Sequence, residues 1–411
     1  MKKNVISSLI VAILFIISAC GPVSINTGGE TISIQEPTPV NLQDQAPNSD
    51  ANQPVGTVSY KQPKMIVVDS GDEIGLTFYN LQGQAVTELR TPSAGYFTAG
   101  SVHIAGAVPD GQIMTPLVYH SFNPDSLQMN VNDTITTLVN TPMFYGLAGA
   151  VGEAFIAYST YQPEDDAVTS MLYMGDLNTL PNIGPIFTLE NSDNFYVVNP
   201  LGISTTEGIA TGIWYTLSAW GIGGDIIFPV NQGLYYFDMT SGSSFQFAGA
   251  ECNPQGLSQD LNWAACRGGN SDGGYSYFIK NTAANTAVDF PLDSASDRGA
   301  GYGVFSLDNS YIAWLEASGS HMAETPNYHS RIRIGLTGGG VVFDQDDGAF
   351  AQALGASSVE YIEPVGWIDP QTLLVEVVIE DYGNPSIVKV DVINGSITPF
   401  IHGRFVTFAY P

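Results

Sequence analysis

Residues 302–316 read YGVFSLDNSYIAWLE, and this stretch decides the fold. It holds an apolar run from Gly303 to Leu307, the turn Asp308-Asn-Ser and a second apolar run that begins at Tyr311. Two such runs joined by a turn of Asp, Asn and Ser are typical of a β-hairpin. Farther along, residues 331–335 and 341–344 supply two more short apolar runs around a Gly-rich turn. Residues 302–346 therefore predict one antiparallel unit of four strands.

Weaker copies of this unit recur along the chain. Second-strand candidates are Pro116-Leu-Val-Tyr, Phe155-Ile-Ala-Tyr, Gly212-Ile-Trp-Tyr, Asn262-Trp-Ala-Ala and Leu373-Leu-Val-Glu. Third-strand candidates are Leu172-Tyr-Met-Gly-Asp, Leu234-Tyr-Tyr-Phe-Asp, Tyr275-Ser-Tyr-Phe-Ile and Ile387-Val-Lys-Val-Asp. A repeat of roughly 50 residues indicates a propeller or a solenoid. No segment keeps a helical period of 3.6 residues, so we expect helix to be nearly absent.

The segment Phe305-Ser-Leu-Asp-Asn-Ser-Tyr-Ile-Ala resembles the Phe-Ser-Pro-Asp-Gly-Lys-Tyr-Ile-Ala element of TolB-like and WD-type β-propellers. The resemblance covers one turn and two strands, and it implies an all-β propeller. Counting Met65–Leu89 as a blade that lacks its inner strand gives seven blades. Residues 404–410 would then supply that strand and close the ring, which removes exposed sheet edges. Six or eight blades, or a stacked pair of β-sandwiches, are the alternatives.

The N-terminus predicts export. Lys2 and Lys3 precede an apolar run, Val5–Ile17, which is shorter than the roughly 20 residues of a membrane-spanning helix. Ile17-Ser-Ala-Cys20 resembles the lipobox of bacterial lipoproteins, and the resemblance implies that cleavage precedes Cys20 and that its sulfur is diacylated. A non-lipidated export signal is the alternative. We expect a signal peptide over residues 1–19 and a protein lipid-anchored to the bacterial cell membrane, on its outer face or on the periplasmic side of an outer membrane.

The next segment, residues 20–63, is rich in Pro, Gln, Asn, Thr and Ser and has few apolar residues to bury. Such a composition predicts a disordered tether. Residues 64–411 are then the propeller domain, which we expect to be monomeric.

The net charge of −28 comes from a scarcity of bases, because the chain has only 12 Lys and Arg residues against 40 Asp and Glu residues. A surface of this sign repels polyanions, which argues against DNA, RNA and anionic lipids as ligands. It favours cations, basic partners or neutral ligands. Solvation of an exported surface would by itself also account for this composition.

Acidic, aromatic and imidazole residues gather in the loops that should connect second strands to third strands. In a propeller these loops share one face with the connections between blades, and functional residues concentrate on loops of a rigid scaffold. The alternative is that acids in loops are simply solvated. The candidate binding face comprises Asp72, Glu164, Asp165, Asp166, Trp220, Asp225, Asp272, His321, Glu324, His329, Asp381 and Tyr382.

No cofactor is expected, and calcium is the one metal with a candidate site. Asp344, Asp346 and Asp347 offer hard oxygen ligands, but they lack the full spacing of a calcium loop and could form an ordinary turn between blades. Cys252 and Cys266 are an even pair in an exported chain, which favours a disulfide. Cys266 lies in an apolar run, so a buried free thiol is the alternative.

Recognisable catalytic motifs are missing from the sequence: it has no G-x-S-x-G elbow, H-E-x-x-H motif or P-loop. We therefore expect a binding scaffold more than an enzyme. The resemblance to TolB-like propellers implies a protein or an envelope polymer as the partner. The second class is an extracellular propeller that binds or cleaves carbohydrate, which would require carboxylates that converge at the ring axis.

Overall fold

The computed structural model describes two segments near the N-terminus and most of the remaining chain. The described residues are 24–27, 30–33, 60–69, 71, 75–90, 101–104, 117–122, 125–131, 134–139, 144–163, 167–178, 185–191, 196–219, 226–269, 274–323, 327–379 and 385–411.

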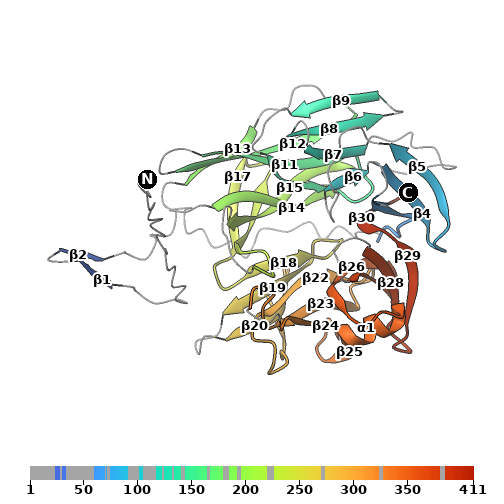
Figure 1. The fold of residues 1–411 in the computed structure, drawn as a ribbon. Coiled ribbons are helices and arrows are strands. Elements are labelled where there is room, and N and C mark those ends of the chain that lie inside the picture. Colours follow the sequence, from blue (N-terminus) through green and yellow to red (C-terminus); the bar gives the residue numbers. More distant parts are fainter. Residues whose placement is uncertain are drawn as a thin grey trace, which may run out of the picture. The chain divides into compact units, whose positions relative to one another are not determined.

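Seven sheets of four antiparallel strands form the body of the molecule (Figure 1). Blade one consists of β30 (Arg404–Ala409), β3 (Met65–Asp69), β4 (Gly75–Asn80) and β5 (Ala85–Arg90). Blade two consists of β6 (Val102–Ile104), β7 (Leu117–Phe122), β8 (Asp125–Val131) and β9 (Thr134–Val139). Blade three consists of β10 (Phe144–Gly149), β11 (Phe155–Pro163), β12 (Val168–Asp176) and β13 (Pro185–Asn191).

The other four blades follow in chain order. Blade four consists of β14 (Tyr196–Thr206), β15 (Ile209–Ala219), β16 (Asn231–Asp238) and β17 (Ser243–Ala248). Blade five consists of β18 (Asn253–Leu257), β19 (Trp263–Gly269), β20 (Tyr275–Asn281) and β21 (Ala287–Phe290). Blade six consists of β22 (Gly299–Phe305), β23 (Tyr311–Ser318), β24 (His329–Leu336) and β25 (Val341–Asp346). Blade seven consists of β26 (Val359–Asp369), β27 (Thr372–Ile379), β28 (Pro385–Asp391) and β29 (Ile397–His402).

This architecture confirms the predicted seven-bladed propeller and excludes the counts of six and eight and the stacked sandwiches. The predicted closure is also confirmed, because β30 pairs with β3 from Met65↔Ala409 to Asp69↔Arg404. First strands of successive blades contact one another, for example β6 with β10, β18 with β22 and β22 with β26. They are therefore the inner strands, around the central channel of a propeller.

Aromatic side chains fill the space between neighbouring blades. Trp314 of blade six is fully buried, and its ring centroid lies 5.2 Å from that of Tyr277 and 4.9 Å from that of Phe290, both in blade five. Trp367 of blade seven is buried as well and donates from Nε1 to the Val304 carbonyl of blade six, at 3.0 Å. Aromatic pairs at these distances contribute about 0.5–1.5 kcal/mol each beyond burial of their area. Second strands such as β23 and β27 are accordingly buried along nearly their whole length.

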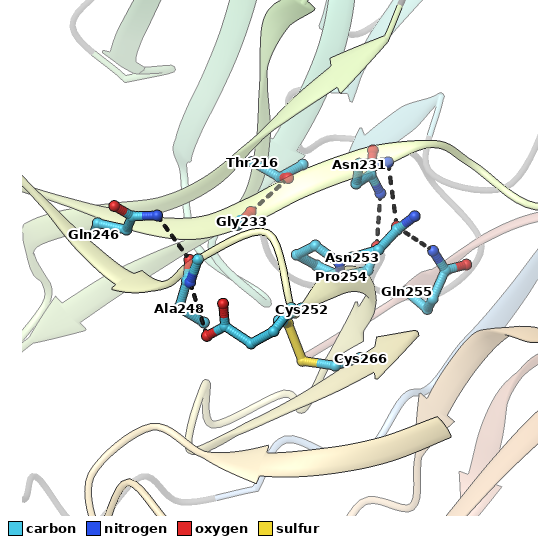
Figure 2. Close-up of a disulfide and its surroundings, with 12 residues drawn as sticks. Thr216, Asn231, Gly233, Gln246, Ala248, Cys252, Asn253, Pro254, Gln255 and Cys266 are labelled. Carbon is cyan, nitrogen blue, oxygen red and sulfur yellow. Dashed lines mark hydrogen bonds between the residues drawn. A yellow bond between two sulfur atoms is a disulfide. The ribbon is translucent and has the colours of Figure 1, made fainter. Parts of the chain in front are cut away.

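Cys252 and Cys266 are joined by a disulfide, the first of the two alternatives left by the sequence (Figure 2). Cys252 lies in the connection from blade four to blade five, and Cys266 lies in β19. Both residues are fully buried. The bond closes a loop with a sequence separation of 14 residues, for which chain entropy predicts a stabilisation of about 3 kcal/mol.

Two features were not predicted from the sequence. The first is a helix, α1 (Asp347–Leu354), which follows β25 where the sequence suggested a simple turn. Asp346 caps the N-terminus of this helix by accepting from the Ala349 amide, and Gly355 ends the helix with a φ of 68°. Within the predicted tether, β1 (Ser24–Thr27) and β2 (Glu30–Ser33) form an antiparallel hairpin. Among the described residues, no helix has the length and apolar character to cross a membrane.

Candidate functional site

Strand order divides the connections of the propeller between two faces. On the loop face, second strands connect to third strands and each blade connects to the next. On the turn face, tight turns connect first strands to second strands and third strands to fourth strands. Asp69, at the end of β3, lies at the loop face, and Asp391, at the end of β28, lies at the turn face.

The predicted binding-face residues fall in the sequence between second and third strands, at the loop face, except His329, which is the first residue of β24. Most of them lie outside the described residues, namely Asp72, Glu164, Asp165, Asp166, Trp220, Asp225, Asp272, Glu324, Asp381 and Tyr382. Of the two that the structure describes, His321 stacks on Tyr328 with ring centroids 3.8 Å apart. His329 is exposed, and its Nδ1 lies 3.5 Å from a carboxylate oxygen of Asp347.

Acids on the turn face have a structural use. Asp176, Asp238 and Asp391 each end a third strand and accept the amide hydrogen of the residue two positions later, at 2.9, 2.7 and 2.8 Å. Asp308 does the same in a turn between a first and a second strand, accepting from the Ser310 amide at 3.0 Å. Such bonds let Asp and Asn specify tight turns. A repeated turn therefore accounts for much of the acid content of this face.

Two glutamates face each other across neighbouring strands of blade seven, a site that the sequence analysis missed. Glu363 of β26 is directly opposite Glu376 of β27, a register that places Cβ atoms about 5 Å apart on the same side of the sheet. Glu376 is 7% exposed; its Oε2 accepts from the Phe405 amide at 2.7 Å, and its Oε1 lies 3.6 Å from Nε of Arg404. The pair thus lies between blade seven and the closing strand of blade one.

Burial, and next the negative charge of Glu376, raise the pKa of Glu363 to about 8, against a smaller opposing effect of Arg404. Glu363 is only partly covered, as expected for a side chain on an inner strand. The pKa of Glu376 is also raised by its burial, although the Phe405 amide and Arg404 favour its ionised form. At neutral pH, Glu363 is therefore a protonated acid that an approaching cation can ionise.

Aromatic groups lie near this carboxylic acid. Tyr302, on the inner strand of blade six, donates from its hydroxyl to the Ile227 carbonyl at 2.8 Å, and its ring centroid is 5.6 Å from that of Phe228. Burial raises the pKa of Tyr302, and the charges of Glu363 and Tyr328 add to the effect. Tyr302 also has a φ of 53°, a left-handed conformation that non-glycine residues seldom adopt.

Amide side chains form a second polar cluster where blades four and five meet at the loop face (Figure 2). The Asn231 side chain donates to the Pro254 carbonyl at 2.6 Å, and its backbone amide donates to Oδ1 of Asn253 at 3.2 Å. Gln255 donates to the same Asn253 oxygen at 2.6 Å, while its own Oε1 is buried without a hydrogen-bond partner among the described residues. We refer to Asn231, Asn253 and Gln255 as the amide cluster.

A groove of about 750 Å³ runs along the outer strands of blade five. Glu251 and Asp289 give it acidic groups, while Tyr275, Phe278 and Phe290 give it aromatic walls. The guanidinium carbon of Arg267 lies 4.6 Å from the centroid of the Tyr275 ring, which holds the ring in place at the groove edge. Aromatic surface beside acids suits a ligand with hydroxyl or ammonium groups.

The calcium candidates have other partners in the structure. Asp344 lies 3.4 Å from Nε of Arg331 and 3.2 Å from Nε of Arg333. Asp346 caps α1, and Asp347 accepts from the Ser330 amide at 3.1 Å. Over the described ranges, no group of three or more His, Cys, Asp or Glu side chains is arranged to hold a metal ion.

Comparison with known proteins shows similarity of fold. No protein-family model and no curated protein matches the sequence. Among solved structures, a prolyl endopeptidase matches with a TM-score of 0.52 and 11% identity, over 84% of this chain and 50% of that one. TolB from Acinetobacter baumannii matches with a TM-score of 0.41 and 13% identity, over 70% of this chain and 63% of TolB. An oligogalacturonate lyase in complex with manganese matches with a TM-score of 0.45 and 10% identity, over 82% of this chain and 83% of the lyase.

The match to the prolyl endopeptidase is a likeness of fold alone. This chain spans about half of the prolyl endopeptidase and less than two thirds of the Acinetobacter TolB. A propeller fold by itself does not specify a function. Function has to be argued from the groups on the two faces.

Proposed function

We propose that this protein is a lipid-anchored scaffold of the bacterial envelope, which binds a basic protein segment or an envelope polymer through the loop face of its propeller. One observation carries the proposal: the carboxyl groups of Glu363 and Glu376 face each other in blade seven, and Glu363, on the inner strand, is partly exposed. The sequence of the connections on the loop face adds further acids.

Binding fits the carboxylate pair better than catalysis does. A glycoside hydrolase needs two carboxyl groups that both reach the scissile bond, about 5–9.5 Å apart. Glu376 cannot do this, because it is 7% exposed and both of its oxygens face Phe405 and Arg404. Glu363 alone remains accessible, as a protonated acid that would release its proton when a cationic group binds.

The partner experiment compares two pairs of variants that remove the same charge. Asp165→Asn with Asp381→Asn changes the loop face, whereas Glu88→Gln with Glu190→Gln changes exposed acids on the fourth strands of blades one and three. Envelope extracts are passed over each immobilised protein, and retained proteins and polymers are quantified. We expect the loop-face pair to lose at least tenfold of the captured partner and the control pair to keep it. Equal loss in both pairs would contradict the proposal.

Lipid anchoring rests on Cys20 and its resemblance to a lipobox, and it is tested separately. Cells that express the full chain are grown with a clickable fatty acid, and the label is compared between the wild type and Cys20→Ala. We expect label and membrane association in the wild type and neither in the variant. Labelled Cys20→Ala protein, or unlabelled wild-type protein, would contradict lipidation and leave the loop-face proposal standing.

A carbohydrate ligand is the second candidate, favoured by the amide cluster and by the aromatic groove of blade five. Amide groups and aromatic faces together recognise polyhydroxylated ligands, since amides bind hydroxyl groups and rings cover the apolar faces of sugars. The measurement is a thermal shift with envelope oligosaccharides, repeated for Asn253→Ala and Tyr275→Ala. A shift that either variant abolishes would favour this candidate over a basic protein segment.

A further inference from the structure

The chain that enters the first blade crosses the ring before it reaches β3. We refer to residues Tyr60–Lys64 as the strap. The strap contacts three blades, no two of which are neighbours: Lys61 reaches blades three and five, and Gln62 donates to the Ile368 carbonyl of blade seven at 3.5 Å. It then enters blade one, where the Lys64 amide donates to the Ala409 carbonyl at 2.8 Å. A short segment can touch blades three, five and seven of one ring only if it passes across the axis.

All of these contacts lie on the turn face. Val151 and Gly152 belong to the turn between β10 and β11, and Gln259 belongs to the turn between β18 and β19. Ile368 and Ala409 lie at the turn-face ends of the inner strands β26 and β30. The strap is therefore placed over the end of the channel that is opposite the loop face.

The strap is held by specific bonds on its backbone and its side chain. Gln259 binds Lys61 twice, accepting from the backbone amide at 3.0 Å and donating to the carbonyl at 2.9 Å. The Lys61 ammonium donates to the Val151 carbonyl at 2.9 Å and lies 3.4 Å from Oε1 of Glu153. Buried or partly buried polar groups satisfied in this way are costly to detach, since each lost partner leaves a desolvated group.

Lys61 packs closely against the turn of blade three and the end of the closing strand. A Cβ atom on Gly152 would lie 3.0 Å from Cδ of Lys61 and 3.0 Å from Cβ of Tyr410, and Gly152 has a φ of 62°. The Tyr410 hydroxyl is hydrogen-bonded to Gln259, and burial raises the pKa of this tyrosine to about 12. The segment before the first blade and the end of the closing strand therefore meet at Gln259.

Glu153 connects the strap to the inner strands below it. Its Oε1 accepts from the Thr205 hydroxyl of β14 at 3.3 Å, and its carbonyl oxygen lies 2.9 Å from Nε2 of His103 in β6. The Lys61 ammonium is thus one member of a polar cluster contributed by blades two, three and four. Such a cluster fills the ring near the axis with protein groups.

We infer that the strap is a built-in plug: it closes the central channel at the turn face, so that a ligand reaches the channel from the loop face. The inference is independent of what the loop face binds. It assigns a role to the last residues of the predicted tether, Tyr60–Pro63, and it places the entry of the chain into the first blade at the turn face.

The test measures how accessible a cysteine is when it is placed beside the plug. The full chain carries Cys20→Ser as the background, because its other two cysteines, Cys252 and Cys266, are joined in the disulfide. Thr205→Cys places a thiol next to Glu153, and Thr240→Cys places one on the exposed turn between β16 and β17 as a control. Each cysteine variant is reacted with a bulky maleimide in two backgrounds: one with the strap intact, and one that also carries both Lys61→Ala and Gln259→Ala. We expect Thr205→Cys to react at least tenfold more slowly than Thr240→Cys, and the double variant to remove most of that difference.

Equal reaction rates for the two thiols with the strap intact would overturn the inference. It would also be overturned if the Thr205→Cys thiol reacted slowly and stayed equally slow in the Lys61→Ala, Gln259→Ala background. Hydrogen exchange separates release of the strap from unfolding of the ring. In the double variant, the Lys64 amide should lose at least tenfold of its protection while the amides of β23 and β27 keep theirs. The variant Gln82→Ala changes an exposed glutamine on the same face, and it should change neither the reaction rate of Thr205→Cys nor the protection of the Lys64 amide.

Discussion

Replacing Glu363 with glutamine should stabilise the protein at neutral pH, because burial and the charge of Glu376 raise the pKa of this carboxyl group above neutrality. The pKa of Glu363 is raised from 4.5 to about 8 by burial and by Glu376. In the unfolded chain the same group loses its proton near its ordinary pKa. Between these two pH values the folded state binds one proton more than the unfolded state, so the stability that the protonated acid confers is complete below about pH 4.5 and is lost as the pH rises through 8.

The size of the effect follows from the shift. One unit of pKa corresponds to about 1.36 kcal/mol. Because of Glu363, the free energy of unfolding of the wild type should therefore be about 3 kcal/mol lower at pH 7 than at pH 4.5. Glutamine has nearly the shape of the protonated acid and does not titrate. The Glu363→Gln variant should therefore match the wild type near pH 4.5 and exceed its free energy of unfolding by up to about 3 kcal/mol at pH 7.

Urea unfolding of the two proteins at half-unit steps from pH 4.5 to 8.5 measures this difference. Glu88→Gln, an exposed substitution of the same kind on β5, should follow the wild type throughout. If the wild-type and Glu363→Gln curves run parallel across this range, Glu363 ionises in the folded protein as an ordinary glutamate does. The account of the carboxylate pair, and of proton release on cation binding, would then be wrong.

Three further predictions test the fold around the site. Cys252→Ser should lower the free energy of unfolding by about 3 kcal/mol under oxidising conditions, and reduction of the Cys252–Cys266 bond in the wild type should remove most of that difference in urea unfolding. Arg333→Met should cost about 3 kcal/mol in the same assay, because it removes the cationic partner, at 2.8 Å, of the fully buried Glu316 and leaves that carboxylate only neutral donors on Asp293, Ser296 and Trp314. Deleting residues 404–411 should expose the edge of β3 and give aggregated protein in size-exclusion chromatography, whereas a chain that stays monomeric would show that closure by β30 is dispensable.

The architecture could be predicted from the sequence because each blade is specified locally. The unit at residues 302–346 has its turn residues, its apolar runs and its order of strands within one short stretch. Closure was also predictable, since a blade with three strands and a single strand left at the other end of the sequence complete each other. The helix α1 was not predictable in this way, because Asp346 and Gly348 are equally compatible with a turn.

The carboxylate pair was missed because it depends on ring geometry. Glu363, Glu376 and Arg404 come from three strands, and the sequence does not show which side chains of blade seven turn toward the closing strand. One local signal was present: Glu376 is a single acid within the apolar run Leu373–Ile379. Glu316 stands in the same way within β23, where it is fully buried and paired with Arg333. A carboxylate inside a buried strand requires a partner, so such positions point to charge networks.

The strap changes how the negative charge of this protein should be interpreted. Under the proposed lipid anchoring, a tether that joined the domain at the loop face would place the acid-rich connections beside the membrane, where anionic lipids repel them. The strap instead brings the chain in across the turn face, whose acids are largely occupied in hydrogen-bonded turns. The loop face, with Glu363 near its centre, is then free to meet a partner in the surrounding medium. The charge distribution and the path of the chain therefore favour the same face for binding, although they depend on different residues.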